Sequence, residues 1–346
     1  MTRARTNANV TAAVGRNMII NGAMNVSQRA TSVTGLGAAS GYFTLDRWRI
    51  SEGDASAGRF TMSQTADGPN GISANCIKLD CTTADTSIAA GEFLQVVQKI
   101  EGQNLQRIGK GVAGAKQITA SFYVKANAAF TFALELFDGD NGRQITKLFD
   151  TTTDWVRHEI TFPADVDDGS SPFNDDNAES LLVQFTLHAG SNRTSGTLNT
   201  ATWANSTTAN RFVGIDSFFS NTDNNFFITG VQLEVGPVAT EFEQEDIGVT
   251  LGKCQRYFEN VVSFDSNSLF WSGDATSGVT YFIGTGYSVP KRANATVTVT
   301  AVNVSGFSTT ISADSNTTSG FRTSCACSST GNGKYFRCQW TADAEL

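Results

Sequence analysis

The sequence contains few side chains that could act as a nucleophile or a general base. Only two histidines occur in the 346 residues, His158 and His188. Both fall in segments where apolar and polar residues alternate, His158 on the apolar side and His188 on the polar side, so we expect structural roles for both. No Gly-x-Ser-x-Gly elbow, phosphate-binding glycine loop or His-Glu-x-x-His motif is present. We therefore expect a protein that is not an enzyme and that needs no cofactor.

Carboxylates deserve separate consideration, because glycoside hydrolysis requires only two of them. Glu135 and Asp138 border one predicted strand, and Glu234 points outward from another. An outward glutamate on a strand is usually solvated, so we rank catalysis well below that interpretation. The turns 138–141 and 165–168 loosely resemble calcium loops, but neither fits the 12-residue pattern. We predict ordinary solvated turns and no metal site.

Aromatic side chains matter if the ligand is a sugar, because flat apolar rings can stack on the faces of pyranoses. Trp203 and Trp271 lie in polar or mixed segments, and Tyr281 and Tyr287 lie near a predicted loop rim. We name these four as candidate ligand-binding residues. The competing interpretation, which we favour for each, is a partly buried ring that closes one end of a β-sandwich.

The composition restricts the partners. A formal net charge of −8 is unsuited to a phosphate backbone, so we expect no nucleic acid partner. No apolar run approaches the roughly 18 residues that cross a bilayer, so we expect no membrane insertion. The N-terminus has two arginines but lacks the hydrophobic core of a signal peptide. We therefore expect the six cysteines to be reduced packing residues rather than disulfides or zinc ligands.

Alternation with a period of two is the main structural signal. It is clearest in FTFALELF (130–137), ITASFYVKA (118–126), VRHEITF (156–162), LLVQFTLHA (181–189) and FFITGVQLEV (226–235). Such strands form antiparallel sheets with one core face and one wet face, and two of these sheets make a β-sandwich or jelly roll. For the last strand we expect Phe227, Thr229, Val231, Leu233 and Val235 to face the core and Gln232 and Glu234 to face outward.

One stretch after residue 243 has helical spacing instead. In EDIGVTLGKCQRYFEN the residues Val249, Leu251, Cys254 and Phe258 would form one apolar stripe. We therefore predict an all-β chain with a short helix between two β-sandwiches. Its parts are an attachment arm (1–16), an N-terminal jelly roll (17–243), a helical connector (244–260) and a smaller C-terminal β domain (261–346).

Several blocks of the sequence, in this order, resemble one protein family. They are RNMIINGAMNVSQRATS (16–32), YFTLDRW (42–48), FFITGVQLEVGPVATEFE (226–243), LGKCQRYFE (251–259) and WTADAEL (340–346). The succession is similar to tail-fibre and receptor-binding proteins of phages. In those proteins Asn-x-Ile-x-Asn-Gly, Gln-Arg and Asp-Arg-Trp motifs start a jelly roll like that of carbohydrate-binding modules. The motif residues look fold-forming, so the resemblance transfers no binding site.

The resemblance implies a virion protein, assembled in the host cytoplasm, that is often a homotrimer and mediates host attachment. The arm would join other tail or head proteins, and we expect the host ligand to be a surface glycan. Three alternatives remain: a purely structural fibre or decoration subunit, a glycan depolymerase, and an exported carbohydrate-binding module of a bacterial enzyme.

Overall fold

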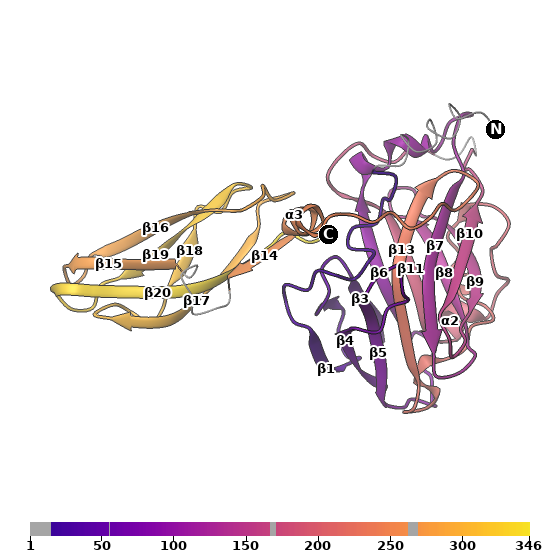
Figure 1. Ribbon diagram of the computed structural model, residues 1–346, viewed down its shortest axis with the longest axis horizontal. Coiled ribbons are helices and arrows are strands. Elements are labelled where there is room, and N and C mark those ends of the chain that lie inside the picture. Colours follow the sequence, from indigo (N-terminus) through magenta and orange to yellow (C-terminus); the bar gives the residue numbers. More distant parts are fainter. Residues whose placement is uncertain (1–14, 55, 167–170, 262–268) are drawn as a thin grey trace. The chain divides into compact units, whose positions relative to one another are not determined.

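The chain forms two compact units, 1–247 and 248–346, in a computed structural model (Figure 1). The structure describes residues 15–54, 56–166, 171–261 and 269–346. We call the two parts the N-terminal unit and the C-terminal unit and describe each by itself. The first 14 residues of the predicted attachment arm lie outside the described residues.

The N-terminal unit consists of two antiparallel sheets around one hydrophobic core. Sheet A has the strand order β1-β4-β5-β13-β7-β10, and sheet B has the order β12-β9-β8-β11-β6-β3-β2. The bounds are β1 Ser32–Leu36, β2 Gly41–Tyr42, β3 Arg49–Gly53, β4 Arg59–Thr65, β5 Cys76–Thr83, β6 Phe93–Glu101, β7 Ile118–Ala126, β8 Thr131–Asp138, β9 Arg143–Asp150, β10 Val156–Phe162, β11 Glu179–Ala189, β12 Ala204–Asn205 and β13 Asn225–Val235, with one short helix, α2 Ser191–Thr194. The predicted all-β jelly-roll or sandwich class is confirmed.

The outer face of sheet B differs from the prediction. Phe132, Leu134 and Leu136 of β8 lie in the core as expected. Glu135 of β8 and Gln184 of β11, on the opposite face, are buried as well. The reason is that Arg211, from the segment between β11 and β13, donates hydrogen bonds to both of them. The expectation of a wet outer face is wrong for this part of sheet B, because a distant segment covers it.

Strand β13 also departs from its predicted alternation. Phe226 and Ile228, rather than Phe227 and Thr229, lie in the core. The pairing of β13 with β7 shifts between Thr229 and Gln232, and Gly230 within this interval has a φ of 59°. A bulge of this kind inserts one residue and moves the following side chains to the other face. Beyond it Val231 and Leu233 face the core as predicted.

The N-terminal segment is fastened to β13 by side chains of the Asn-x-Ile-x-Asn-Gly motif. Asn17 accepts a hydrogen bond from the Leu233 amide (3.0 Å) and donates one to the Val231 carbonyl (3.2 Å). The Val231 amide donates to the Gly22 carbonyl, and a Cβ atom at Gly22 would lie 2.1 Å from the Val231 carbonyl oxygen. Glycine is therefore required where the two chains meet. The block 16–32 packs against the block 226–243.

The C-terminal unit is a smaller sandwich of two antiparallel sheets. In sheet C the long strand β20 pairs with β14 and β15 and also with β17, and sheet D has the order β16-β19-β18. The bounds are β14 Phe258–Val261, β15 Leu269–Ala275, β16 Thr280–Gly286, β17 Thr296–Ser305, β18 Ser312–Asp314, β19 Gly320–Ala326 and β20 Gly331–Asp343. The sequence also predicts a strand over Ser268–Trp271, and the first residue of that range lies outside the described residues.

Helix α3 (Ile247–Gln255) occupies the predicted helical stretch, but its predicted apolar stripe is partly wrong. Thr250 and Cys254 are its buried residues, and Phe258 begins β14 instead of continuing the helix. The Tyr257 carbonyl, just before β14, accepts a hydrogen bond from the Ala344 amide (2.8 Å). The blocks 251–259 and 340–346 therefore meet, as the blocks of the N-terminal unit do.

All six cysteines are buried. Burial raises the pKa of Cys76 and Cys81 to about 11 and that of Cys338 to about 12, so these thiols stay protonated near neutral pH. None of the described helices is long and apolar enough to cross a bilayer.

Candidate ligand-binding site

The four aromatic residues named from the sequence do not form one site. Trp203 belongs to the N-terminal unit, whereas the other three belong to the C-terminal unit. Trp271 and Tyr281 pack on each other with ring centroids 4.5 Å apart, and Trp271 also stacks on Phe336. Tyr287 belongs to a different cluster, in which its ring stacks on Phe321 at 5.8 Å. A role in ligand binding stays a prediction for all four.

Tyr287 lies above a buried ion pair. The Lys291 ammonium is 4.5 Å from its ring centroid and 2.6 Å from Oε2 of Glu259. Burial, together with the Glu259 charge, raises the pKa of Tyr287 to about 12. Lys291 also donates to the Gln255 carbonyl at the end of α3 (2.6 Å), so this cluster connects the helix to the sandwich.

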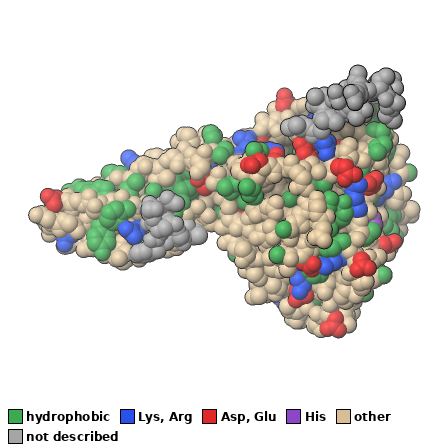
Figure 2. All heavy atoms as spheres, in the orientation of Figure 1, with side chains coloured by type: hydrophobic (Ala, Val, Ile, Leu, Met, Phe, Trp, Pro, Cys, Tyr) green, Lys and Arg blue, Asp and Glu red, His purple; other side chains and the backbone are tan. Residues whose placement is uncertain are grey.

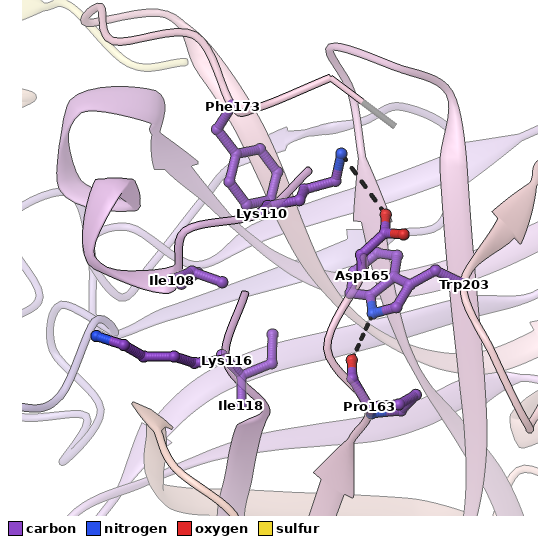
Figure 3. Close-up of a pocket in the computed structure, with 8 residues that line it drawn as sticks. All are labelled: Ile108, Lys110, Lys116, Ile118, Pro163, Asp165, Phe173 and Trp203. Carbon is purple, nitrogen blue, oxygen red and sulfur yellow. Dashed lines mark hydrogen bonds and ion pairs between the residues drawn. The ribbon is translucent and has the colours of Figure 1, made fainter. Parts of the chain in front are cut away.

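Trp203 borders a small internal cavity (Figure 3). The indole Nε1 donates to the Pro163 carbonyl (2.9 Å), and the residue is only 7% exposed. The cavity holds about 10 Å³ and is lined by Ile108, Lys110, Lys116, Ile118, Pro163, Asp165, Phe173 and Trp203. Such a volume accommodates about one water molecule, so a sugar does not fit.

Buried charges surround this cavity and pair with one another. Lys110 contacts Asp138 at 2.7 Å and Asp165 at 3.6 Å, and Arg143 holds both oxygens of Asp165 at 2.8 and 2.9 Å. The prediction of solvated turns is wrong for Asp138 and Asp165, which are both buried. Lys110 and Arg143 lie beside these carboxylates, and their positive charges would repel a calcium ion. Asp167 and Asp168 lie outside the described residues, among which no cluster of His, Cys, Asp or Glu is arranged to hold a metal.

The remaining candidate carboxylates are engaged in structural contacts. Both oxygens of Glu135 bind the guanidinium of Arg211, which opposes the rise in the Glu135 pKa caused by its complete burial. Glu234, predicted to face solvent, is buried instead and accepts hydrogen bonds from the Gln232 amide group and the Thr240 backbone, both at 2.8 Å. These interactions close a loop onto β13.

The two histidines occupy structural positions. His158 stacks on Phe122 with ring centroids 5.4 Å apart, and its Nε2 lies 2.8 Å from the Asp150 carbonyl. His188 is fully buried, with Nδ1 2.8 Å from the Ser217 hydroxyl and Nε2 3.2 Å from Glu92. Burial lowers the pKa of His188.

Within its described residues, the N-terminal unit has an opening of a size suited to a ligand, a hollow of about 420 Å³ beside the loop 68–74. We call it the amide hollow. Its lining consists of Asn25, Gly68, Asn70, Gly71, Ile72, Ser73, Ala74 and Gln244. Pockets for small ligands measure roughly 300–1,000 Å³, and amides and hydroxyls can both donate and accept hydrogen bonds. The amide hollow can therefore satisfy the hydroxyl groups of a sugar.

The loop that forms the amide hollow is closed by its own backbone. The Gly68 amide donates to the Ala74 carbonyl (3.1 Å), and the Ile72 amide donates to the Pro69 carbonyl (3.2 Å). Gly71 has a φ of 79°, a conformation that favours glycine. Gln244, from far along the chain, donates to the Ile72 carbonyl (2.7 Å) and so fixes the wall of the hollow.

Several polar atoms of the amide hollow remain available to a ligand. The side-chain oxygen of Asn25 accepts a hydrogen bond from the Asn75 side chain (3.0 Å). The side-chain nitrogen of Gln244 donates to the Ile72 carbonyl. The Asn25 nitrogen, the Gln244 oxygen and the whole amide of Asn70 make no hydrogen bond within the described part of the chain. The hollow thus offers donors and acceptors from three different segments.

An aromatic and cationic cluster lies at the base of the same loop. The indole of Trp155 donates to the Asp67 carbonyl (3.0 Å), and Lys125 pairs with the Asp67 carboxylate (2.7 Å). The Lys125 ammonium lies 5.2 Å from the Trp155 ring and 4.8 Å from the Phe227 ring. These contacts hold the loop against the outer face of sheet A.

Sequence reasoning did not identify the amide hollow. Asn25, Asn70 and Ser73 have residue types of ordinary turns, and Gln244 comes from a distant part of the chain. The glycine-rich and asparagine-rich run DGPNGISAN (67–75) was the one local signal of a built loop.

No protein-family model matches the chain, and no curated protein matches it. Solved structures similar to it include the family 11 carbohydrate-binding module of the cellulosomal cellulase Lic26A-Cel5E of Clostridium thermocellum. This module is 14% identical, the match covers 61% of this chain and 98% of the module, and the TM-score is 0.29.

Two further structures are similar to a comparable degree. The enzymatically active domain of tailspike protein 4 of bacteriophage CBA120 is 12% identical over 64% of this chain and 21% of that one, with a TM-score of 0.31. The module TmCBM61, in complex with β-1,4-galactotriose, is 13% identical over 64% of this chain and 99% of that one, with a TM-score of 0.32. Similarities at this level assign the chain to no family.

Proposed function

We propose that this chain is a non-enzymatic phage virion protein, a tail fibre or related fibre, that attaches to a host-surface glycan through the amide hollow. The observation that carries the glycan part is the hollow itself. It is open, and it presents the uncommitted amide atoms of Asn25, Asn70 and Gln244. A glycan is rich in hydroxyls that donate and accept, which is the chemistry that carboxamides match.

The proposal that the protein is not an enzyme rests on the carboxylates. Glycoside hydrolysis needs one carboxyl group as an acid and another as a base or nucleophile, both next to the substrate. Glu135, Asp138 and Asp165 are buried in ion pairs with arginine or lysine, and Glu234 is buried in hydrogen bonds. None of these four lines the amide hollow.

The virion part of the proposal is supported by the ordered motif blocks. The block 16–32 bonds to the block 226–243, and the block 251–259 bonds to the block 340–346. The blocks that resemble the phage family thus act together in forming the fold. We propose a location in the virion, an oligomer of three copies, and attachment to other virion proteins through residues 1–16. On the face shown in Figure 2, charged side chains of both signs are scattered, which suits binding of a neutral glycan.

The test is a glycan array probed with the full chain, followed by a reducing-end assay on any polysaccharide that is bound. Binding without release of reducing ends is the expected result. Binding with release would replace the proposal by a depolymerase. If no glycan binds and the protein does not compete with phage for adsorption to cells, the purely structural alternative is correct.

A further inference from the structure

Strand β17 of the C-terminal unit has one open edge. This strand, TVTVTAVNVS, pairs with β20 along one side, with a register shift between Ala301 and Asn303. Within the described part of the chain, its backbone hydrogen bonds go to β20 alone. The exposed edge therefore presents a row of amide and carbonyl groups that can pair with another strand.

Over residues 296–301 the edge of β17 lacks the features that usually prevent such pairing. Natural proteins protect open edges with charged residues, prolines or very short strands. Thr296–Ser305 contains no charged residue and no proline. Its side chains alternate regularly, with threonines at 296, 298 and 300 exposed and the valines between them half-buried. The stretch 296–301 is thus regular and uncharged, and the register with β20 shifts only after it, between Ala301 and Asn303.

Most other described edges of the molecule are protected. Strands β2 and β12 have two residues each, β18 has three and carries Asp314, and β1 has five and an irregular register. On longer edges, β10 carries Arg157 and Glu159, and β15 carries Asp274. The one other long edge without charge is β16, TYFIGTG. Two unprotected edges therefore remain, and both belong to the C-terminal unit.

The edges of β16 and β17 lie on opposite sides of this unit. Strand β17 ends sheet C and β16 ends sheet D (Figure 1). At one side of the sandwich, β17 of sheet C contacts β18 of sheet D. At the other side, β15 of sheet C contacts β16 of sheet D. Two different edges on opposite sides cannot meet within one chain, but they can meet between neighbouring chains.

We infer that the edge of β17 in one copy of this chain pairs with the edge of β16 in the next copy. The contact is heterologous, and heterologous contacts close into rings of three or more copies when the rotation permits. Each junction would continue a sheet from one copy into the next. It would also place the exposed Phe282 of β16 beside the threonine row of β17, a favourable aromatic and β-branched combination.

A second copy is the occupant indicated by the strands themselves. The partner must supply an uncharged strand of similar length that is unpaired on one side, and this chain supplies such a strand at β16. The inference concerns assembly, and it holds whether or not the amide hollow binds a glycan. Its failure is therefore distinguishable from a failure of the proposed glycan binding.

The test uses one added lysine on each edge. Thr298→Lys places a charge on the exposed side of β17. Gly284→Lys does the same in the middle of β16, where a Cβ atom would meet nothing within 4 Å. Gln339→Lys is the matched control, because it adds the same charge to the face of sheet C on the internal strand β20. Circular dichroism of each variant verifies folding, and light scattering gives its mass.

We expect the unmodified chain and Gln339→Lys to have at least three times the monomer mass of 36.9 kDa, and both edge variants to be monomers. A mixture of Thr298→Lys and Gly284→Lys should give a one-to-one dimer, because each variant retains the edge that the other lacks. Loss of assembly in Thr298→Lys alone would indicate β17 pairing with itself and would overturn the inference. A monomeric unmodified chain, or an unchanged mass in both edge variants, would overturn it as well.

Discussion

The indole Nε1 of Trp48 donates a hydrogen bond of 3.1 Å to the backbone carbonyl of Asn21, and both residues are buried. Asn21 has a φ of 59°, and its side chain bonds to the backbone of Asn25, Val26 and Asp46. The Asn-Gly and Asp-Arg-Trp motifs are thus two halves of one buried junction. Their appearance together in the sequence reflects the folding of the sandwich and not the binding of a ligand.

Substitutions at Asn21 should separate the contribution of its side-chain hydrogen bonds from that of its left-handed backbone conformation. Asn21→Ala removes four side-chain hydrogen bonds and strains the left-handed backbone, so we expect a loss of about 3 kcal/mol in the free energy of unfolding. Asn21→Gly loses the same bonds but relieves the backbone, so its loss should be about 1 kcal/mol smaller. Denaturant unfolding monitored by circular dichroism measures both. Equal losses would show that the backbone conformation contributes nothing.

Arg211 should be much more important to stability than an exposed arginine. Arg211→Ala leaves Glu135 buried without its cation, which costs about 3 kcal/mol or more. Combining Arg211→Met with Glu135→Leu should recover most of this loss. The matched control is Arg322→Ala, whose partner Asp314 is exposed to solvent, and it should leave thermal stability unchanged. Similar effects of the two single alanine variants would contradict our description of the covered face of sheet B.

Glu52 should make stability depend on pH. Burial raises its pKa from 4.5 to about 7, although the Arg59 charge opposes the rise. Because the folded pKa exceeds the unfolded one, the stabilising contribution is complete below about pH 4.5 and is lost as the pH rises through 7. The free energy of unfolding of Glu52→Gln should equal that of the unmodified chain at low pH and exceed it by about 1 kcal/mol above pH 7. The expected difference is small because Glu52 is only half-buried and solvent screens its charge. A difference independent of pH would contradict the assignment.

The six cysteines should be inaccessible in the native protein. All are buried, and burial raises the pKa of the thiols of Cys76, Cys81 and Cys338 well above neutral pH. A thiolate-specific reagent at pH 8 should label fewer than one thiol per chain before unfolding and all six afterwards. Fewer than six after unfolding without a reductant would show that disulfides form.

The sequence predicts the sheets well because alternation is a local property. The pattern in β7, β8 and β11 correctly identifies Phe122, Leu134 and Phe185 as core residues. The bulge at Gly230 escaped prediction, because a single glycine in an alternating run does not reveal that the register shifts. One alternation therefore cannot describe both sides of such a point, and the residues before the bulge, Phe227 and Thr229, are the ones whose faces are predicted wrongly.

The site was less predictable than the fold for a related reason. Burial of Glu135 depends on Arg211, and the lining of the amide hollow combines Asn25 with Gln244. Both arrangements join residues that are far apart in the sequence, and no local period encodes them. The sequence names Trp203 as a candidate ligand-binding residue because its neighbours are polar, yet Pro163 accepts its indole hydrogen bond inside the unit.

The central claim is tested most directly by the affinity of the full chain for the best glycan on the array, compared with that of the double variant Asn70→Ala, Gln244→Ala. Each lost hydrogen bond is worth about 1 kcal/mol, so we expect binding at least about tenfold weaker. The control is Asn332→Ala, an exposed amide in the C-terminal unit, which should bind like the unmodified chain. An unchanged affinity in the folded double variant would contradict a glycan site in the amide hollow.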